Sequence, residues 1–374
     1  MGKGNFIIIG ASYLQVPLIK KAKELGYTVH VFAWQDGAVG AEIADCFYPI
    51  SITEKDEILK IIAPLQPVGV ATIASDLAGK TVNYLARELN LPSNSAECEE
   101  ISTNKLKMRE SFLKNGVPSP KFIAVDEKFS KEKLKDFCYP LIVKSVDRSG
   151  SRGVTKVNKG EDLDQAISFA QNESFNKKAI IEEYITGHEY SVEMIAQNKE
   201  YHFLAITKKF TSGAPHFVEK AHLEPGIQDC LLKKNIIEET IKACKALQIT
   251  NGAIHAELKV TYEGEIKFIE VASRMGGDYI GSHLVELTTG YDFVSGVIEV
   301  ACGNKLSKNF SNHFEYAVVI FDTLPKQLIN QNNLVLHEII HEKKDTILDS
   351  SDRAEVYILA SNDYSIIEQY IPNN

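Results

Sequence analysis

Apolar positions in the first part of the chain alternate between the spacing of buried strands and the spacing of helices. Short apolar runs typical of strands flank a stretch with helical spacing, and a further run then starts the same alternation again; these segments are 5–10, 16–25, 28–33 and 68–73. A strand, a helix and a strand in this order form a unit whose two strands run parallel. We therefore predict a first lobe built on a parallel sheet and ending near residue 98.

The middle and the end of the chain mix the two patterns. Three segments have helical spacing, at 102–116, 162–171 and 231–247. The region from about 121 to 190 is otherwise rich in strand patterns, with glycine-containing loops between them. The tail holds further apolar runs at 316–321 and 355–360. We expect a small closing α+β lobe there, so the fold class combines α/β and α+β parts.

Two alternating runs, 252–260 and 265–272, are separated by a Tyr-Glu-Gly turn and predict an antiparallel hairpin. Each run carries one carboxylate near a paired position, Glu257 and Glu270, and Arg274 follows. Two acids on adjacent strands can hold divalent cations against a polyphosphate, because Mg²⁺ prefers one or two carboxylates plus phosphate oxygens. The arginine could hold an anionic substrate or a developing oxyanion. Taken alone, the pattern also fits a surface hairpin with solvated charges.

Composition narrows the class of protein. A chain of 374 residues can form two or three lobes, and its net charge of −9 argues against a nucleic-acid surface. No apolar run approaches the ~20 residues of a membrane span, and the first apolar run is too short for a signal peptide. The six cysteines contain no CxxC pair, which indicates reduced thiols. We expect a cytoplasmic protein without nucleic-acid or membrane partners.

A strand ending in Lys144 leads into a loop rich in serine and glycine and then into another strand. Glycine and serine let backbone N–H groups converge on phosphate oxygens, and Lys144 adds a fixed positive charge. The loop is not a P-loop, because the Gly-x-x-x-x-Gly-Lys-Ser/Thr pattern and the following helix are absent. A glycine also ends the first strand, but the other two glycines and the acidic residue of a dinucleotide site are missing. This pattern favours a phosphate-binding loop over an NAD site, with a simple hairpin loop as the alternative.

A buried strand at 179–183 ends in Glu182 and Glu183 and continues into Tyr184 and Ile185. A connecting segment of this kind offers backbone N–H and C=O groups to the edge of a purine. The later Glu189 could accept hydrogen bonds from ribose hydroxyls. On their own, the paired acids also fit a strand end that faces water.

These elements occur in a fixed order along the chain: Lys105, Lys144 with its loop, Glu182 to Ile185, Glu189, Glu257, Glu270 and Arg274. In this order and spacing they resemble the ATP-grasp superfamily of carboxylate–amine (or thiol) ligases, which includes biotin carboxylase, D-alanine–D-alanine ligase and purine-pathway ligases. The resemblance covers nearly the whole chain up to about 303. It implies a Rossmann-like lobe, an ATP-grasp domain containing a mobile lid subdomain, and a C-terminal α+β lobe, at 1–98, 99–303 (lid about 121–188) and 304–374.

The resemblance also implies roles for individual residues toward ATP. The two lysines that contact the phosphates would be Lys105 and Lys144. The lid loop that folds over the triphosphate would contain Ser149, Gly150, Ser151 and Gly153. The adenine amino group would be bound by Glu182, and the purine edge would be read by the backbone of Glu183 and Ile185. The ribose would be bound by Glu189.

At the reacting end, the resemblance makes Glu257 and Glu270 ligands of Mg²⁺ or Mn²⁺, with two ions expected. Arg274 would serve the acyl-phosphate site together with Lys144, and both are predicted catalytic residues. One position departs from the family pattern Glu-x-Asn-x-Arg, because Ala272 stands where the asparagine ligand is usual. The alanine leaves open a weaker second metal site.

The resemblance implies an enzyme that joins a small-molecule carboxylate to an amine, with an amide, ADP and phosphate as products. We expect an amino acid or a similar small carboxylate, bound by His216, Glu219, Arg274, Gly276, Gly277 and Asp278. A purine-pathway type of ligase or carboxylase on a phosphoribosyl substrate is the alternative within the family, although few arginines remain to hold another phosphate. A degenerate ATP-binding module is the alternative outside catalysis. The sequence does not indicate the oligomeric state, but the resemblance makes a homodimer possible, because dimers are common among relatives.

Overall fold

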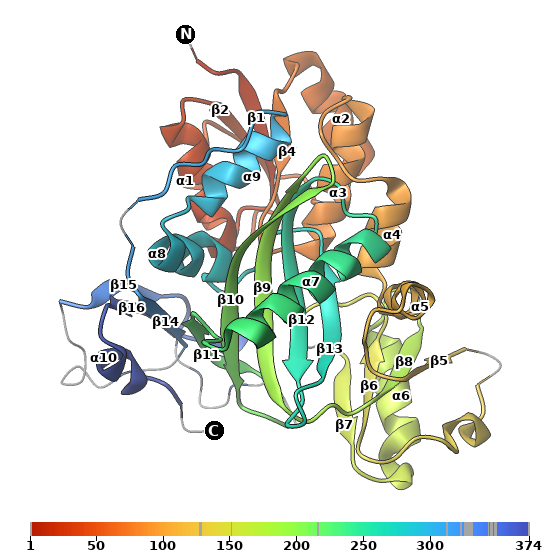
Figure 1. Cartoon of the computed structure of the whole chain (residues 1–374). Helices are drawn as coiled ribbons and strands as arrows, with labels where there is room; N and C mark the ends of the chain where they lie inside the picture. Colours follow the sequence, from red (N-terminus) through yellow and green to blue (C-terminus); the bar gives the residue numbers. More distant parts are fainter. Residues whose placement is uncertain are drawn as a thin grey trace.

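The computed structural model describes residues 2–372 except 127, 128, 151, 215, 216, 312, 322, 323, 325–331, 343, 345, 346, 348 and 349. The described strands form three sheets, which contain four, eight and four strands (Figure 1). The first sheet belongs to the N-terminal lobe, the large sheet forms the centre of the molecule, and the third forms a separate lid.

The N-terminal sheet is parallel, as predicted, with strand order β3-β2-β1-β4. Its strands are β1 (Asn5–Ile9), β2 (Thr28–Phe32), β3 (Cys46–Tyr48) and β4 (Gly69–Ala71). Its helices are α1 (Val16–Glu24), α2 (Lys55–Ile62) and α3 (Asp76–Glu88). The sequence did not predict α2 or the short edge strand β3, because a three-residue edge strand carries too short an apolar run to recognise.

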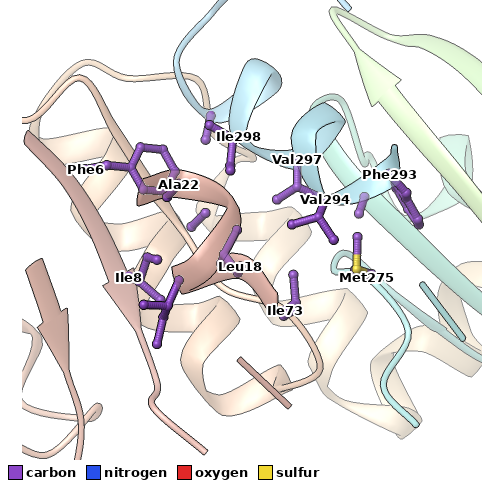
Figure 2. Close-up of a cluster of buried hydrophobic side chains, with 14 of the residues drawn as sticks. Phe6, Ile8, Leu18, Ala22, Ile73, Met275, Phe293, Val294, Val297 and Ile298 are labelled. Atoms are coloured by element: carbon purple, nitrogen blue, oxygen red, sulfur yellow. The ribbon is translucent and has the colours of Figure 1, made fainter. Parts of the chain in front are cut away.

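A later helix, α9 (Phe293–Ala301), completes the core of this lobe. Val297 and Ile298 pack with Phe6 and Leu18 from the first fifty residues, and Met275 lies in the same cluster (Figure 2). Burial of each such side chain contributes roughly 1.5–3 kcal/mol. The N-terminal lobe is therefore held to the rest of the chain by a shared apolar core.

The lid is an antiparallel sheet of order β5-β8-β6-β7 with its own small core. Its strands are β5 (Phe122–Val125), β6 (Leu141–Ser145), β7 (Val154–Val157) and β8 (Ala179–Glu183). The predicted helix is α6 (Leu163–Glu173), which packs on this sheet. Two helices, α4 (Ala96–Thr103) and α5 (Lys105–Asn115), lead from the first lobe toward the lid (Figure 1).

The central sheet has the order β13-β12-β9-β10-β11-β14-β16-β15. Its first five strands in chain order are β9 (His188–Gln197), β10 (Glu200–Thr211), β11 (Glu219–Glu224), β12 (Gly252–Val260) and β13 (Ile266–Ala272). The helix α7 (Cys230–Ala246) lies across one face, where Ile236 and Ala243 share a core with β9 and β12. This sheet carries the predicted hairpin.

The tail continues the central sheet, because β14 pairs with β11. Its elements are β14 (Tyr316–Ile320), β15 (Leu334–Ile339), β16 (Glu355–Ser361) and α10 (Tyr364–Glu368). A short helix, α8 (Val285–Thr289), precedes α9. Among the described residues, no helix has the length and apolar character needed to cross a membrane.

Candidate active site

The predicted hairpin is confirmed as β12 and β13, and its two carboxylates, Glu257 and Glu270, lie directly opposite each other in the register. Like charges at such a pair destabilise a sheet unless cations compensate them. Lys209 Nζ on β10 lies 2.5 Å from Glu257 Oε1, and Lys105 Nζ lies 3.1 Å from Glu270 Oε1. The two acids are therefore held in place by lysines from two other elements.

A cavity of about 200 Å³ runs between the lid and the central sheet and ends at this hairpin. Most of the predicted nucleotide, metal and acyl-phosphate residues line it: Lys105, Lys144, Ser149, Gly150, Glu182, Glu183, Ile185, Glu189, Glu257, Glu270 and Arg274. Gly153 does not line this cavity, and Ser151 lies outside the described residues. Folding thus brings together positions that are up to 169 residues apart, from Lys105 to Arg274.

Glu182 is buried between two cations at the inner wall of the cavity. Lys144 Nζ lies 2.7 Å from its Oε2, and Arg109 Nε lies 2.8 Å from its Oε1. Burial alone would raise the pKa of Glu182, but the charges of Arg109 and Lys144 outweigh it and hold the pKa below the ordinary value. Burial, in turn, lowers the pKa of Lys144 despite the Glu182 charge. Lys144 therefore has one fixed carboxylate partner from the lid.

Arg109 was missed by the sequence analysis. It lies four residues after Lys105 on α5, so both side chains project from the same face of that helix. Arg109 is fully buried, and its guanidinium also donates a hydrogen bond to the carbonyl of Ile269, at 2.7 Å. The spacing was visible in the sequence, but the partner, Glu182, is 73 positions away.

The lid passes into the central sheet between β8 and β9, at the segment predicted to read a purine. The ring of Tyr184 lies under two ammonium groups, with Lys156 Nζ at 3.9 Å and Lys259 Nζ at 5.4 Å from its centroid. The backbone N–H of Glu183 donates a hydrogen bond to the carbonyl oxygen of Lys121, at 3.0 Å. The carbonyl of Ile185 accepts a longer bond from Lys259, at 3.5 Å. Both of these backbone groups therefore have partners within the protein, although Glu183 and Ile185 line the cavity.

Arg274 is anchored by the N-terminal lobe. Its Nε and Nη2 donate to the two carboxylate oxygens of Asp76, at 2.8 and 3.1 Å. Burial would raise the pKa of Asp76, but the Arg274 charge holds it below the ordinary value. Asp76 begins α3 just after β4, at the carboxyl edge of the parallel sheet, where ligands of such sheets bind. The sequence analysis identified Arg274 but not this partner.

His255 forms a second brace behind the hairpin. It is buried, and its Nδ1 pairs closely with Glu193 while Nε2 lies 3.3 Å from Glu257 Oε1. Burial opposes the charged ring, but Glu193 and Glu257 outweigh burial and raise the pKa of His255 to about 9. The backbone N–H of Gly276 donates to Glu193 at 3.2 Å, and a side chain there would lie 2.7 Å from His255. Gly276 thus packs against this brace and lines neither of the two cavities discussed here.

A second cavity, of about 480 Å³, opens beside the first. Of the predicted substrate residues, Glu219, Arg274, Gly277 and Asp278 line it, whereas His216 lies outside the described residues. Asp278 accepts two hydrogen bonds from Arg353 of the C-terminal segment, at 2.8 and 2.6 Å. Burial would raise the pKa of Asp278, but Arg353 holds it well below the ordinary value. Asp278 thus already has a cationic partner within the protein.

The donor set of the first cavity suits a nucleoside triphosphate with divalent cations. Two opposed carboxylates can each supply a metal ligand, and Lys105, Lys144 and Arg274 can meet phosphate charge. Within the described ranges, no group of three or more His, Cys, Asp or Glu side chains is placed to hold a metal ion by itself. Ala272 also lines the cavity and supplies no ligand. A cation here would depend on phosphate oxygens and water, as Mg²⁺ commonly does.

Part of the chain is similar in sequence to known proteins. The family model for the ATP-grasp domain matches residues 137–282. Alanine–anticapsin ligase of Bacillus subtilis (strain 168) is 29% identical over 242 residues, which cover 58% of this chain and 50% of that protein. The chain therefore spans about half the length of this curated relative.

Solved structures extend the likeness to the whole fold. The L-amino acid ligase from Bacillus licheniformis matches with a TM-score of 0.83 at 21% identity, covering 99% of this chain and 96% of that one. N5-carboxyaminoimidazole synthetase from Staphylococcus aureus, complexed with ADP, matches with a TM-score of 0.81 at 16% identity, covering 98% and 96%. The domain match identifies residues 137–282 as an ATP-grasp domain, and the solved structures show that the chain as a whole shares their fold.

Proposed function

We propose that the protein is an ATP-dependent carboxylate–amine ligase that forms an amide bond through an acyl phosphate and releases ADP and phosphate. The observation that carries this proposal is the position of Arg274, Glu257 and Lys209. These three residues line both the nucleotide cavity and the second cavity. A phosphate group at the end of the first cavity and a carboxylate in the second would meet between them.

The residues of the first cavity would bind and orient ATP. Lys105 and Lys144 would hold phosphate oxygens, and the segment from Glu182 to Ile185 would hold the base. Glu257 and Glu270 would hold Mg²⁺ or Mn²⁺, which when bound neutralises phosphate charge and exposes the terminal phosphorus to a nucleophile. Phosphoryl transfer needs positioning and charge neutralisation more than covalent help from the protein.

The reaction would proceed in two steps. A substrate carboxylate oxygen attacks the terminal phosphorus, the bond to ADP breaks, and an acyl phosphate forms. The amine nitrogen then attacks the acyl carbon, the carbon–oxygen bond to phosphate breaks, and the amine loses a proton. Arg274, held by Asp76, is placed to stabilise the negative oxygen of the tetrahedral intermediate. The lid loop with Ser149 and Gly150 borders both cavities and could exclude water from the acyl phosphate.

We infer that the carboxylate is an amino acid or a similarly small molecule. Alanine–anticapsin ligase and L-amino acid ligase are named for such substrates, and the second cavity has the size of a small polar ligand. A non-catalytic ATP-binding module is the second candidate, because Ala272 removes one potential metal ligand from the cavity. Mg²⁺ keeps several waters, so this loss is compatible with turnover.

The test is ADP release from Mg-ATP while amino acids are supplied singly and in pairs. The proposal predicts release that depends on a particular pair, with one amide formed per ADP. Glu270→Gln should lower turnover by about 100-fold or more, because it removes a charge at the metal site. Glu265→Gln, an exposed carboxylate in the same hairpin, is the matched control and should retain full turnover. Nucleotide binding without turnover on any pair would favour the non-catalytic module.

A further inference from the structure

His222 on β11 is a fully buried histidine with both ring nitrogens unsatisfied. Neither Nδ1 nor Nε2 has a hydrogen-bond partner among the described residues. The carboxylate of Asp278 is close, but its Oδ2 lies 3.6 Å from Nε2, beyond hydrogen-bond distance. The ring packs edge-on against Phe321, with centroids 5.6 Å apart. Because buried polar groups almost always have partners, these two nitrogens require an explanation.

The place of His222 supplies one, since this side chain lines the second cavity. In the sheet His222 is directly paired with Lys209, so the two side chains lie on the same face. Lys209 lines both cavities and contacts the metal-site carboxylate Glu257. His222 is therefore one strand away from the proposed reaction centre, at a more distant part of the same cavity.

The charges around His222 are already balanced. The Asp278 carboxylate and the Arg353 guanidinium form a two-bond pair, and Arg353 stacks over Phe321 at 3.9 Å. Neither charge of this pair is left uncompensated for a charged side chain of a ligand. A neutral imidazole has one donor and one acceptor nitrogen, so a ligand group with both an acceptor and a donor would satisfy the ring.

We propose that His222 is a specificity-determining residue that hydrogen-bonds a neutral polar side chain of the amino-acid substrate. This inference rests on the proposed function and narrows it to substrates that carry a carboxamide or hydroxyl group. A carboxamide can accept from one ring nitrogen and donate to the other, or to Asp278. An apolar isostere would leave both nitrogens unpaired, and sites built to hydrogen-bond a substrate discriminate strongly against analogues that lack the group.

The test compares polar amino acids with apolar ones of similar shape: asparagine with leucine, glutamine with methionine, and threonine with valine. Binding to the full chain is measured by calorimetry with Mg²⁺ and a non-hydrolysable ATP analogue, and ADP release is measured in parallel with ATP. In the wild type we expect at least one polar member to bind about 10- to 100-fold more tightly than its apolar counterpart. His222→Phe should abolish this preference, whereas His222→Gln should retain part of it. Affinity for the ATP analogue should be unchanged in both variants, which also reports that they fold.

The two readouts separate the two proposals. Selective binding that depends on His222 without ADP release would support this inference and overturn the ligase proposal. ADP release with equal binding of polar and apolar members would overturn this inference and leave the ligase proposal standing. Equal preference in the wild type and His222→Phe, or no binding of any of the six amino acids, would also overturn it.

Discussion

Two buried carboxyl groups of this protein, Glu182 and Glu224, differ in whether their hydrogen-bonding partners carry a positive charge. Glu182 faces two cations, and its pKa stays below the ordinary value. Glu224 is equally buried, and within the described part of the chain it accepts hydrogen bonds only from the hydroxyls of Thr207 and Thr288, at 2.9 and 2.5 Å. Burial therefore raises the pKa of Glu224 from 4.5 to about 8. A charge without a cationic partner is costly in such a place, so Glu224 should be protonated at neutral pH.

This contrast predicts how stability depends on pH. Because the pKa of Glu224 is higher in the folded state, its contribution to stability is complete below pH 4.5 and is lost as the pH rises through about 8. The free energy of unfolding should fall between these values by up to ~1.4 kcal/mol per pH unit from this group. Glu224→Gln should remove that part of the slope. Urea titrations of both proteins at pH 5.5 and 7.5 measure the free energy of unfolding. If it changed equally with pH in the two proteins, the raised pKa of Glu224 would be contradicted.

The sequence predicted which residues gather at the cavity where they belong to an ordered motif, and it did not predict residues that are placed by a distant partner. Lys144, Glu257, Glu270 and Arg274 line one cavity, as their order along the chain predicts, and their roles there stay predictions. Asp76 was not predicted as a site residue, because it lies 198 positions from Arg274, to which it is hydrogen-bonded. A local sequence pattern cannot predict a contact between residues so far apart in the chain. His222 was passed over for the same reason, since burial and missing partners are properties of the folded chain.

Among the elements, the connection from the lid to the central sheet requires a glycine. Gly187, between β8 and β9, has a positive φ of +143°. A Cβ added there would lie 2.1 Å from the carbonyl oxygen of Val260, which is backbone and cannot rotate away. Only glycine therefore allows this close approach, two residues after the segment that is predicted to bind the purine.

We expect Gly187→Ala to destabilise the protein by about 3 kcal/mol or more and to weaken ATP binding. The matched control is Gly264→Ala in the hairpin turn, where φ is also positive, at +87°, but no atom lies within 4 Å of the added carbon. That variant should lose only about 1 kcal/mol, since it has the backbone strain without the overlap. Urea unfolding and nucleotide titration of the two variants test this, and equal losses would show that the backbone overlap is relieved at little cost.

Elements with a strong local pattern were predicted and others were not. The parallel unit of β1, α1 and β2 and the hairpin of β12 and β13 are confirmed, because each has clear periodicity. The tail strands at 316–321 and 355–360 were also found, but their pairing was not. β14 joins β11, so the tail extends the central sheet rather than standing apart from it. Strand pairing between remote segments depends on tertiary packing, which apolar spacing does not encode.

At the scale of the whole molecule, the second cavity draws on three parts of the chain. Tyr13 comes from the N-terminal lobe, Lys209 from the centre of the large sheet, and Arg353 from the C-terminal segment. The first cavity lies between the lid and that sheet and shares its inner wall with the second. Under the proposed function, this arrangement would place a nucleotide and a small polar substrate on either side of Arg274. In the proposed reaction, the terminal phosphate of a nucleotide in the first cavity would pass to a carboxylate in the second.

The most direct measurement follows the oxygen atoms of the carboxylate. A substrate that supports ADP release is labelled in its carboxylate with oxygen-18, and the released phosphate is analysed by mass spectrometry. An acyl phosphate requires one labelled oxygen in each phosphate, because that oxygen forms the bond to phosphorus and leaves with it when the amine attacks. Unlabelled phosphate, or AMP and pyrophosphate in place of ADP, would contradict the account.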